Sequence, residues 1–357
     1  MNSSIIFCGD IMPGGVLPYQ NTFVNSEVLR TLNNASIRVG TLEAAIGEGL
    51  PFDESKMSDR CNIIYARDQD ITRIINLGIN IVSLANNHVF DLGIDGFKNT
   101  IKILKENKIQ YCGAGSNIAE ARKPTIIKLG DYTLAILAYC MFGSKYIGQV
   151  PIATEVSHGV NPLIMEHVVT DIKAIKSKCD YVFVMPHWGR EYDMCPLDEC
   201  ITMAHEMIDA GADAIVGSHP HIVQPLVKYK GKNIAFSLGN FLFPDFYMKP
   251  PRPIWYPSSI DETKNIENVI GYPFPINKPT LQIWNNLSRI GLAVEFKLNH
   301  ERKISLSKHF VKLTDQNILQ PLGRNLKYKL RLFIFLLITK YRIFNHLYKS
   351  YLSIVSK

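Results

Sequence analysis

The sequence predicts an α/β protein, because short apolar runs alternate with amphipathic helical segments over the first 240 residues. Hydrophobic residues make up 46% and charged residues 20% of the chain, values typical of a globular protein, which excludes a disordered chain or a coiled coil. Polar residues recur directly after the predicted strands. In open α/β sheets ligands bind at that edge, so this third observation places a candidate site there.

The expected strands are short apolar runs, and in chain order they are Ile5–Cys8, Ile37–Leu42, Ile79–Leu84, Thr133–Ala138, Tyr181–Met185, Ala214–Val216 and Ile234–Ser237. The expected helices carry apolar residues three and four positions apart. They are Asp70–Leu77, Gly96–Asn107, Met165–Lys178 and Asp198–Ala210. This alternation is typical of βαβ units.

A proline-rich segment follows the last of these strands. Eight of the 19 prolines fall in residues 243–279, together with Tyr, Phe and Trp. Proline breaks helices and removes donors from strand ladders, so we expect a long ordered loop or lid here. Two strands are expected beyond it, at Ile290–Leu298 and Lys303–Leu313. We therefore expect one domain over residues 1–315 and a separate tail over 316–357.

The tail is basic and aromatic. After Asp315 there are eight Lys or Arg residues, seven aromatic residues and no Asp or Glu. Its apolar stretch Leu332–Thr339 is too short to span a bilayer, which needs about 20 residues. An interfacial helix on anionic lipid fits this composition. The alternative is a helix docked on the body or on a partner subunit.

The charge and the cysteines bear on partners and location. Without the tail the chain has 31 basic and 32 acidic residues, so charge gives no support for nucleic-acid binding. The seven cysteines are scattered without a CxxC pair, which favours free thiols in a reducing compartment. The apolar run at Ile5–Cys8 is too short for a signal peptide. We expect a cytoplasmic protein, peripheral at the inner membrane face, without a transmembrane helix.

Five of the expected strand ends carry residues that can bind a metal ion. They are Asp10, Glu43, the trio Asn86, Asn87 and His88, then His187, and finally the pair His219 and His221. Carboxylates, an amide oxygen and neutral imidazoles suit Mn, Fe, Zn or Mg better than a metal that prefers thiolates. One carboxylate with several histidines can hold two ions, as in two-metal hydrolases.

Several of these residues also have a simpler interpretation. Asp10 could cap a turn before Pro13, and Asn86 with Asn87 could form an Asx turn. Any single buried histidine is more often a hydrogen-bonded core residue than a ligand. Arg190 and Glu191 could face an anionic substrate or form a surface ion pair. Asn240 could close the site or stand in a turn.

Several motifs along residues 5–245 resemble the CapA family, which is named for capsule and poly-γ-glutamate synthesis. They are GDIMPGG at 9–15, TLEAAIG at 41–47, SLANNHVFDLGIDG at 83–96, GAG at 113–115, PHWGREYD at 186–193, GADAIVGSHPHIVQP at 211–225 and FSLGNF at 236–241. The family is similar to calcineurin-like metallophosphoesterases. The resemblance implies a four-layered α/β/β/α sandwich with two divalent metal ions at the strand ends.

The resemblance also implies a role for each residue. Glu43 is the bridging carboxylate; Asp10, Glu43 and His221 hold one ion, and Glu43, Asn87, His187 and His219 hold the other. His88 is the proton donor to the leaving group and Asp91 orients it. Arg190, Glu191 and Asn240 are candidates for substrate contact. Phosphoesterases of this type show D-x-H at the first strand, but here Met12 replaces the histidine, which leaves one metal site a ligand short.

Two functions follow from this reading. The first is a metal-dependent hydrolase or transferase that acts on a cell-surface polymer or its precursor, with a phosphoester or a γ-glutamyl amide as substrate. The second is a non-catalytic, metal-stabilised scaffold that recruits a polymer synthase at the membrane through the tail.

Overall fold

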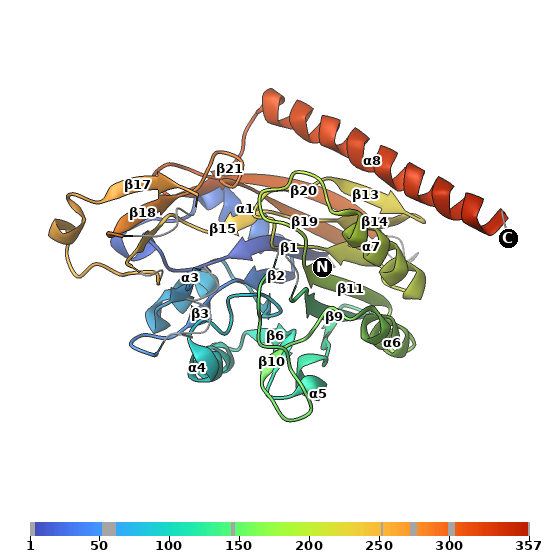
Figure 1. The fold of residues 1–357 in the computed structure, drawn as a ribbon, viewed down its shortest axis with the longest axis horizontal. Coiled ribbons are helices and arrows are strands. Elements are labelled where there is room, and N and C mark those ends of the chain that lie inside the picture. The colour runs from blue at the N-terminus through green and yellow to red at the C-terminus, as the bar shows by residue number, and fades with distance from the viewer. Residues whose placement is uncertain are drawn as a thin grey trace.

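Two large β-sheets stacked face to face form the centre of the molecule, and helices cover their outer faces (Figure 1). The structure is a computed structural model that describes residues 4–51, 62–143, 147–250, 253–271, 277–298 and 304–355. This arrangement confirms the expected α/β class and the layered sandwich.

The first sheet has the order β21-β20-β19-β1-β2-β5-β6, and β15 pairs with β1. Its strands are β1 (Ser4–Ile11), β2 (Ile37–Leu42), β5 (Ile81–Ser83), β6 (Gln110–Cys112), β15 (Asn240–Leu242), β19 (Ile290–Leu298), β20 (Ile304–Leu313) and β21 (Leu319–Pro321). The pairs along β1-β2-β5-β6 are parallel. Parallel pairing brings the carboxyl ends of β1, β2 and β5 to one edge.

The second sheet has the order β13-β14-β12-β11-β9-β8. Its strands are β8 (Thr125–Leu129), β9 (Tyr132–Cys140), β11 (Tyr181–His187), β12 (Ala214–Val216), β13 (Leu226–Tyr229) and β14 (Lys232–Ala235). The central strands β9, β11, β12 and β14 run parallel, and antiparallel strands flank them. Short pairs β3–β4 (Ala45–Ile46, Tyr65–Ala66) and β7–β10 (Ala114–Gly115, Gly159–Val160) lie outside both sheets.

The structure contains seven α-helices in the described residues. They are α1 (Ser26–Asn33), α3 (Ile71–Asn76), α4 (Gly93–Glu106), α5 (Ile118–Ala121), α6 (Met165–Lys176), α7 (Asp198–Ala210) and α8 (Leu326–Val355). The Asn25 side chain caps α1 by accepting a hydrogen bond from the Glu27 amide at 2.8 Å. Helix α7 ends at Gly211, whose φ of 120° lies in a region that favours glycine.

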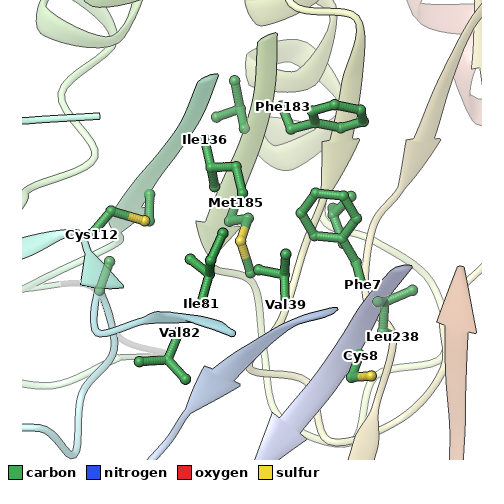
Figure 2. Packing of buried hydrophobic residues seen from close by; sticks show 14 of the residues in the cluster. Phe7, Cys8, Val39, Ile81, Val82, Cys112, Ile136, Phe183, Met185 and Leu238 are labelled. Carbon is green, nitrogen blue, oxygen red and sulfur yellow. The ribbon is translucent and has the colours of Figure 1, made fainter. Parts of the chain in front are cut away.

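Aromatic and aliphatic side chains fill the space between the two sheets. The Phe7 ring of β1 lies 5.1 Å from that of Phe183 in β11, and Phe296 of β19 lies 5.3 Å from Phe183. Figure 2 shows Val39 and Ile81 of the first sheet next to Met185 of the second. This apolar packing holds the two sheets against each other, and it thereby also positions their strand ends relative to one another.

Four of the expected elements have the bounds read from the sequence: Ile37–Leu42, Ala214–Val216, Ile290–Leu298 and helix Asp198–Ala210. The other expected helices and strands are present with shifted ends. The expected strand at Lys303–Leu313 is β20, and Lys303 lies outside the described residues.

The proline-rich segment at 243–279 is more than the expected loop. It carries β16 (Phe246–Met248) and β17 (Glu267–Ile270), which pair with β18 (Thr280–Ile283) in a three-stranded sheet. Phe246 and Met248 are fully buried in a second apolar cluster. The prolines lie between these strands rather than within them, so the strands keep their ladder hydrogen bonds.

The tail begins later than expected, because the residues after Gln316 belong to the body. Asn317 is buried and its side chain bonds both the amide and the carboxylate of Asp245. Leu319, also buried, lies in β21 and pairs with Leu313. The tail helix is α8, which starts at Leu326. No helix in the described ranges has the length and apolar content needed to cross a membrane.

Candidate metal centre

Side chains from the strand ends of both sheets converge at one point. Asp10 lies in β1 and Glu43 follows β2, whereas His187 ends β11 and His219 and His221 follow β12. The ligand atoms of Asp10, Glu43 and His221 lie within 4.8 Å of one another, and those of Glu43, His187 and His219 do the same. Glu43 belongs to both groups.

The carboxylates of this cluster fit a bound cation. In the described part of the chain, both oxygens of Glu43 and Oδ1 of Asp10 are buried and accept no hydrogen bond from an N–H or hydroxyl group. The nearest imidazole nitrogens to Glu43 Oε1 belong to His187 at 3.5 Å and His221 at 3.6 Å. Burying carboxylate oxygens without such partners is costly, and a divalent ion would supply the missing interaction.

Burial shifts the titration of this cluster. Burial raises the pKa of Asp10 and of Glu43, and the neighbouring Asp10 charge raises the pKa of Glu43 further. Burial also lowers the pKa of His187 well below its usual value and that of His221 to about 3. Both imidazoles are therefore neutral at neutral pH, and a neutral imidazole has a lone pair for a metal ion.

Asn240 fixes the orientation of His221. Its Nδ2 donates to the Ser288 carbonyl at 3.0 Å, so its Oδ1 faces His221 Nδ1 at 2.8 Å and accepts from it. The remaining nitrogen, Nε2, then carries the lone pair and faces Glu43. The sequence made Asn240 a candidate for substrate contact; in the structure its side chain is buried and orients a histidine.

His187 is oriented in a similar way. Its Nδ1 lies 2.9 Å from Ser218 Oγ, and its Nε2 lies 2.8 Å from Asn87 Oδ1 and 3.5 Å from Glu43 Oε1. Asn87, His187 and Glu43 thus point to one place, as the predicted ligand set requires. Ser218 was not among the predicted site residues, although it directly precedes the His-Pro-His motif.

The His-Pro-His loop has an unusual backbone. His219 and His221 have positive φ values of 96° and 54°, which non-glycine residues seldom adopt and which are common at functional sites. The backbone amide of His219 donates to Asp10 Oδ2 at 3.4 Å, so Asp10 meets this loop rather than capping a turn before Pro13.

A close approach of two strands brings Asp10 to Asn240. Strand β15 pairs with β1 so that Asp10 lies beside Asn240 in register. At the adjacent position only glycine fits, because a Cβ on Gly9 would collide with the carbonyl oxygen of Gly239. The close approach of β15 to β1 therefore explains why glycine precedes Asp10 in the first motif.

His88 and Asp91 form a second, adjacent unit. His88 Nδ1 lies 2.7 Å from Asp91 Oδ2, and the same oxygen accepts the Ile64 amide at 2.6 Å. Asn86 Oδ1 accepts the His88 amide at 2.9 Å, which is the Asx turn that the sequence allowed. Asp91 thereby engages Nδ1, so Nε2 is the His88 ring nitrogen that this carboxylate does not contact.

Met12 does not take the place of a ligand. Its side chain is fully buried in the second apolar cluster with Phe243 and Trp284. Its sulfur accepts a hydrogen bond from the Gly14 amide at 3.2 Å. The position where phosphoesterases of this type carry a histidine is therefore part of an apolar wall.

The remaining candidates lie at the margin of the site. Arg190 is exposed, whereas Glu191 is partly buried, and burial raises its pKa to about 7. Two aromatic rings that were not predicted also lie here: the rings of Tyr192 and Trp284 are 6.3 Å and 5.1 Å from the His221 ring. Trp284 comes from beyond β18, and no motif marked it. These rings give the site an aromatic wall.

Comparisons with known proteins identify relatives of this chain. The family model described as bacterial capsule synthesis protein PGA_cap matches residues 4–245. The capsule biosynthesis protein CapA of Bacillus anthracis is 33% identical over 246 residues, which cover 66% of this chain and 58% of that protein. The PGA biosynthesis protein CapA of Bacillus subtilis is 33% identical over 189 residues, or 53% of this chain and 49% of that protein.

The chain thus spans about half the length of these curated relatives. A Staphylococcus aureus crystal structure, provisionally named a 5'-nucleotidase, matches with a TM-score of 0.45 and 12% identity. That match covers 91% of this chain and 55% of the other. The family match includes every strand end from Asp10 to His221. The chain belongs to the bacterial capsule synthesis protein PGA_cap family.

Proposed function

We propose that this chain is a metal-dependent hydrolase or transferase that acts in the synthesis of a cell-surface polymer. The observation that carries this proposal is the place of Glu43, a buried carboxylate shared by two groups of potential ligands. The names of its Bacillus relatives support the polymer context. A phosphoester and a γ-glutamyl amide are the two substrate classes that this site could cleave or transfer.

Different residues of the chain would bind the metal ions, donate the proton and contact the substrate. When bound, divalent ions would polarise the substrate's oxygen and favour deprotonation of the attacking water. Asp10, Glu43, Asn87, His187, His219 and His221 would hold them. His88 would donate a proton to the leaving group, and Asp91 would keep its ring in the required orientation. Glu191 and Arg190 stand where they could contact an incoming substrate.

The proposal includes a place and partners. The six described cysteines are free thiols, which suits a reducing compartment, so we propose the cytoplasmic side of the membrane. The polymer or its precursor would be the substrate, and a polymer synthase would act beside this protein.

The test compares two variants of buried glutamates. Glu43→Gln should remove most of the bound metal and the activity found in an ester-hydrolysis screen with added Mn²⁺. Glu295→Gln is the matched control, because Glu295 is also buried and lies 3.3 Å from His309, away from the site. Unchanged metal content in Glu43→Gln would contradict the bridging role.

A second candidate function is a metal-stabilised scaffold that recruits a polymer synthase. The observation that favours it is Met12, which packs in an apolar wall where phosphoesterases carry a histidine. A scaffold would bind metal and melt at a higher temperature with it, yet show no turnover on either ester or amide substrates. Turnover that Glu43→Gln abolishes would exclude this candidate.

A further inference from the structure

Helix α8 presents an apolar stripe that the rest of the described chain does not cover. Large hydrophobic side chains on it are 42–82% exposed: Leu326, Leu330, Phe333, Ile334, Leu337, Ile338 and Tyr341. They make up more than half of the exposed large hydrophobics among the described residues. Such a concentration on one element marks an interaction surface rather than scattered surface residues.

The opposite face of the same helix is docked on the body. Tyr328 and Thr339 are buried, and Leu332, Leu336 and Ile343 pack against the core. Arg342 bonds the Asp198 carboxylate at 2.7 Å and the Pro196 carbonyl at 2.8 Å. The helix therefore has two apolar faces, and the body accounts for only one of them.

Basic residues border the exposed stripe. Successive residues of a helix are 100° apart around its axis. On this spacing Lys329 and Lys340 lie on one side of the stripe and Arg331 lies on the other. Lys327 lies inside the stripe, close to the side of Arg331. All four side chains are exposed. Since no Asp or Glu follows Asp315, no acid on the helix offsets this charge.

Figure 1 shows α8 as a straight helix along one edge of the molecule, with no other element on its outer side in this view. The exposed stripe runs parallel to the helix axis from Leu326 to Tyr341, about 24 Å at 1.5 Å per residue. A straight apolar stripe with cations on both sides is complementary to a flat surface that has anionic groups outside and an apolar interior.

We propose that the outward face of α8 binds an anionic lipid bilayer, with the helix lying in the interface between the body and the membrane. The apolar stripe would enter the headgroup and acyl boundary, and the Lys and Arg side chains would reach the anionic headgroups. The charge pattern favours lipid over a second copy of this chain, because the two basic borders of paired helices would repel each other. This inference does not depend on the chemistry of the metal centre.

The test uses the full chain with sucrose-loaded vesicles of 30% phosphatidylglycerol in phosphatidylcholine, or of phosphatidylcholine alone. The protein should sediment with the anionic vesicles at low salt and less at high salt, because salt screens the attraction. The double variant Phe333→Glu with Leu337→Glu should bind about 100-fold more weakly, with unchanged melting temperature and metal content. Ile126→Glu, which changes an exposed hydrophobic residue on β8, is the matched control and should bind like the parent.

Three results would overturn the proposal. One is full-length protein that stays in the supernatant with anionic vesicles at low salt. Another is binding that the double variant retains. The third is equal binding to neutral and anionic vesicles, since the basic borders would then have no part. If light scattering instead shows a dimer that the double variant dissociates, and no vesicle binding, the face is an interface between copies of this chain.

Discussion

At the scale of single residues, a substitution of His88 would test the proposed catalysis separately from metal binding. His88→Ala should keep the bound metal but lower turnover by about 10²–10⁴-fold, the usual size of a general-acid contribution. The loss should be smaller for esters with good leaving groups, which need no protonation to depart. Turnover of a nitrophenyl ester and of an alkyl ester, measured side by side with metal content, checks this.

The comparison contains its own control. Equal losses on both esters would show that His88 does not protonate the leaving group. Loss of metal from His88→Ala would instead make the residue a ligand or a support for the neighbouring Asn87.

Glu191 gives a pH-dependent prediction. Burial raises the pKa of its carboxyl to about 7, so the folded chain holds this proton more tightly than the unfolded chain does. The resulting stability is present below the unfolded pKa of about 4.3 and is lost as the pH rises through about 7. Glu191→Gln should therefore raise the melting temperature of the metal-free protein at pH 8 and leave it unchanged at pH 4.

The matched control is Glu267→Gln. Lys278 lowers the pKa of the Glu267 carboxyl, so this substitution should give no gain at pH 8. Melting curves in the presence of a chelator are required, since a bound cation near Glu191 would favour its charged form. An equal gain for Glu191→Gln at both pH values would indicate better packing rather than titration.

At the scale of elements, β21 and α8 respond differently to truncation. A chain that ends at Gly323 loses only α8 and should keep a folded body that binds metal. A chain that ends at Gln316 also loses Asn317 and Leu319, so Asp245 loses its two hydrogen bonds with Asn317 and β20 loses its edge strand β21. We expect it to be poorly soluble or to melt at a clearly lower temperature, as measured by circular dichroism.

The same elements show what the sequence could predict. Strand Ile37–Leu42 and helix Asp198–Ala210 were predicted with their bounds because each has a strong local pattern that polar or glycine residues interrupt. Strand β16 was missed because the surrounding prolines suggested a loop, and only its pairing with the distant β18 makes it a strand. Strand β21 has no comparable local signal, because it is only three residues long, ends in a proline and borders the basic tail.

The candidate site divides in a similar way. Asp10, Glu43 and the histidines could be predicted because ligands follow strand ends and parallel strands end together. The positions of Ser218 and Asn240 behind His187 and His221 could not, because they depend on which side chains meet after the sheets have stacked. The position of Trp284 could not be predicted either, since this residue follows the last strand of the small sheet and contacts His221 only in the folded chain.

At the scale of the whole molecule, metal should stabilise the fold. A ligand that binds only the folded state adds about 2.7 kcal/mol when its concentration is a hundred times its dissociation constant. Removing metal with a chelator should therefore lower the melting temperature, and adding Mn²⁺ should restore it. The Glu43→Gln variant should show neither change, and a chelator effect of equal size in that variant would contradict the assignment.

The candidate metal ligands come from distant parts of the chain and from the strand ends of both sheets. Asp10 lies in β1 and Glu43 follows β2 of the first sheet, whereas His187 ends β11 and both His219 and His221 follow β12 of the second. No single segment can assemble the site, and the sheets must stack first. We therefore expect metal to bind late in folding, after the transition state. Added metal should slow unfolding and leave the refolding rate unchanged, as stopped-flow measurements with and without Mn²⁺ would show.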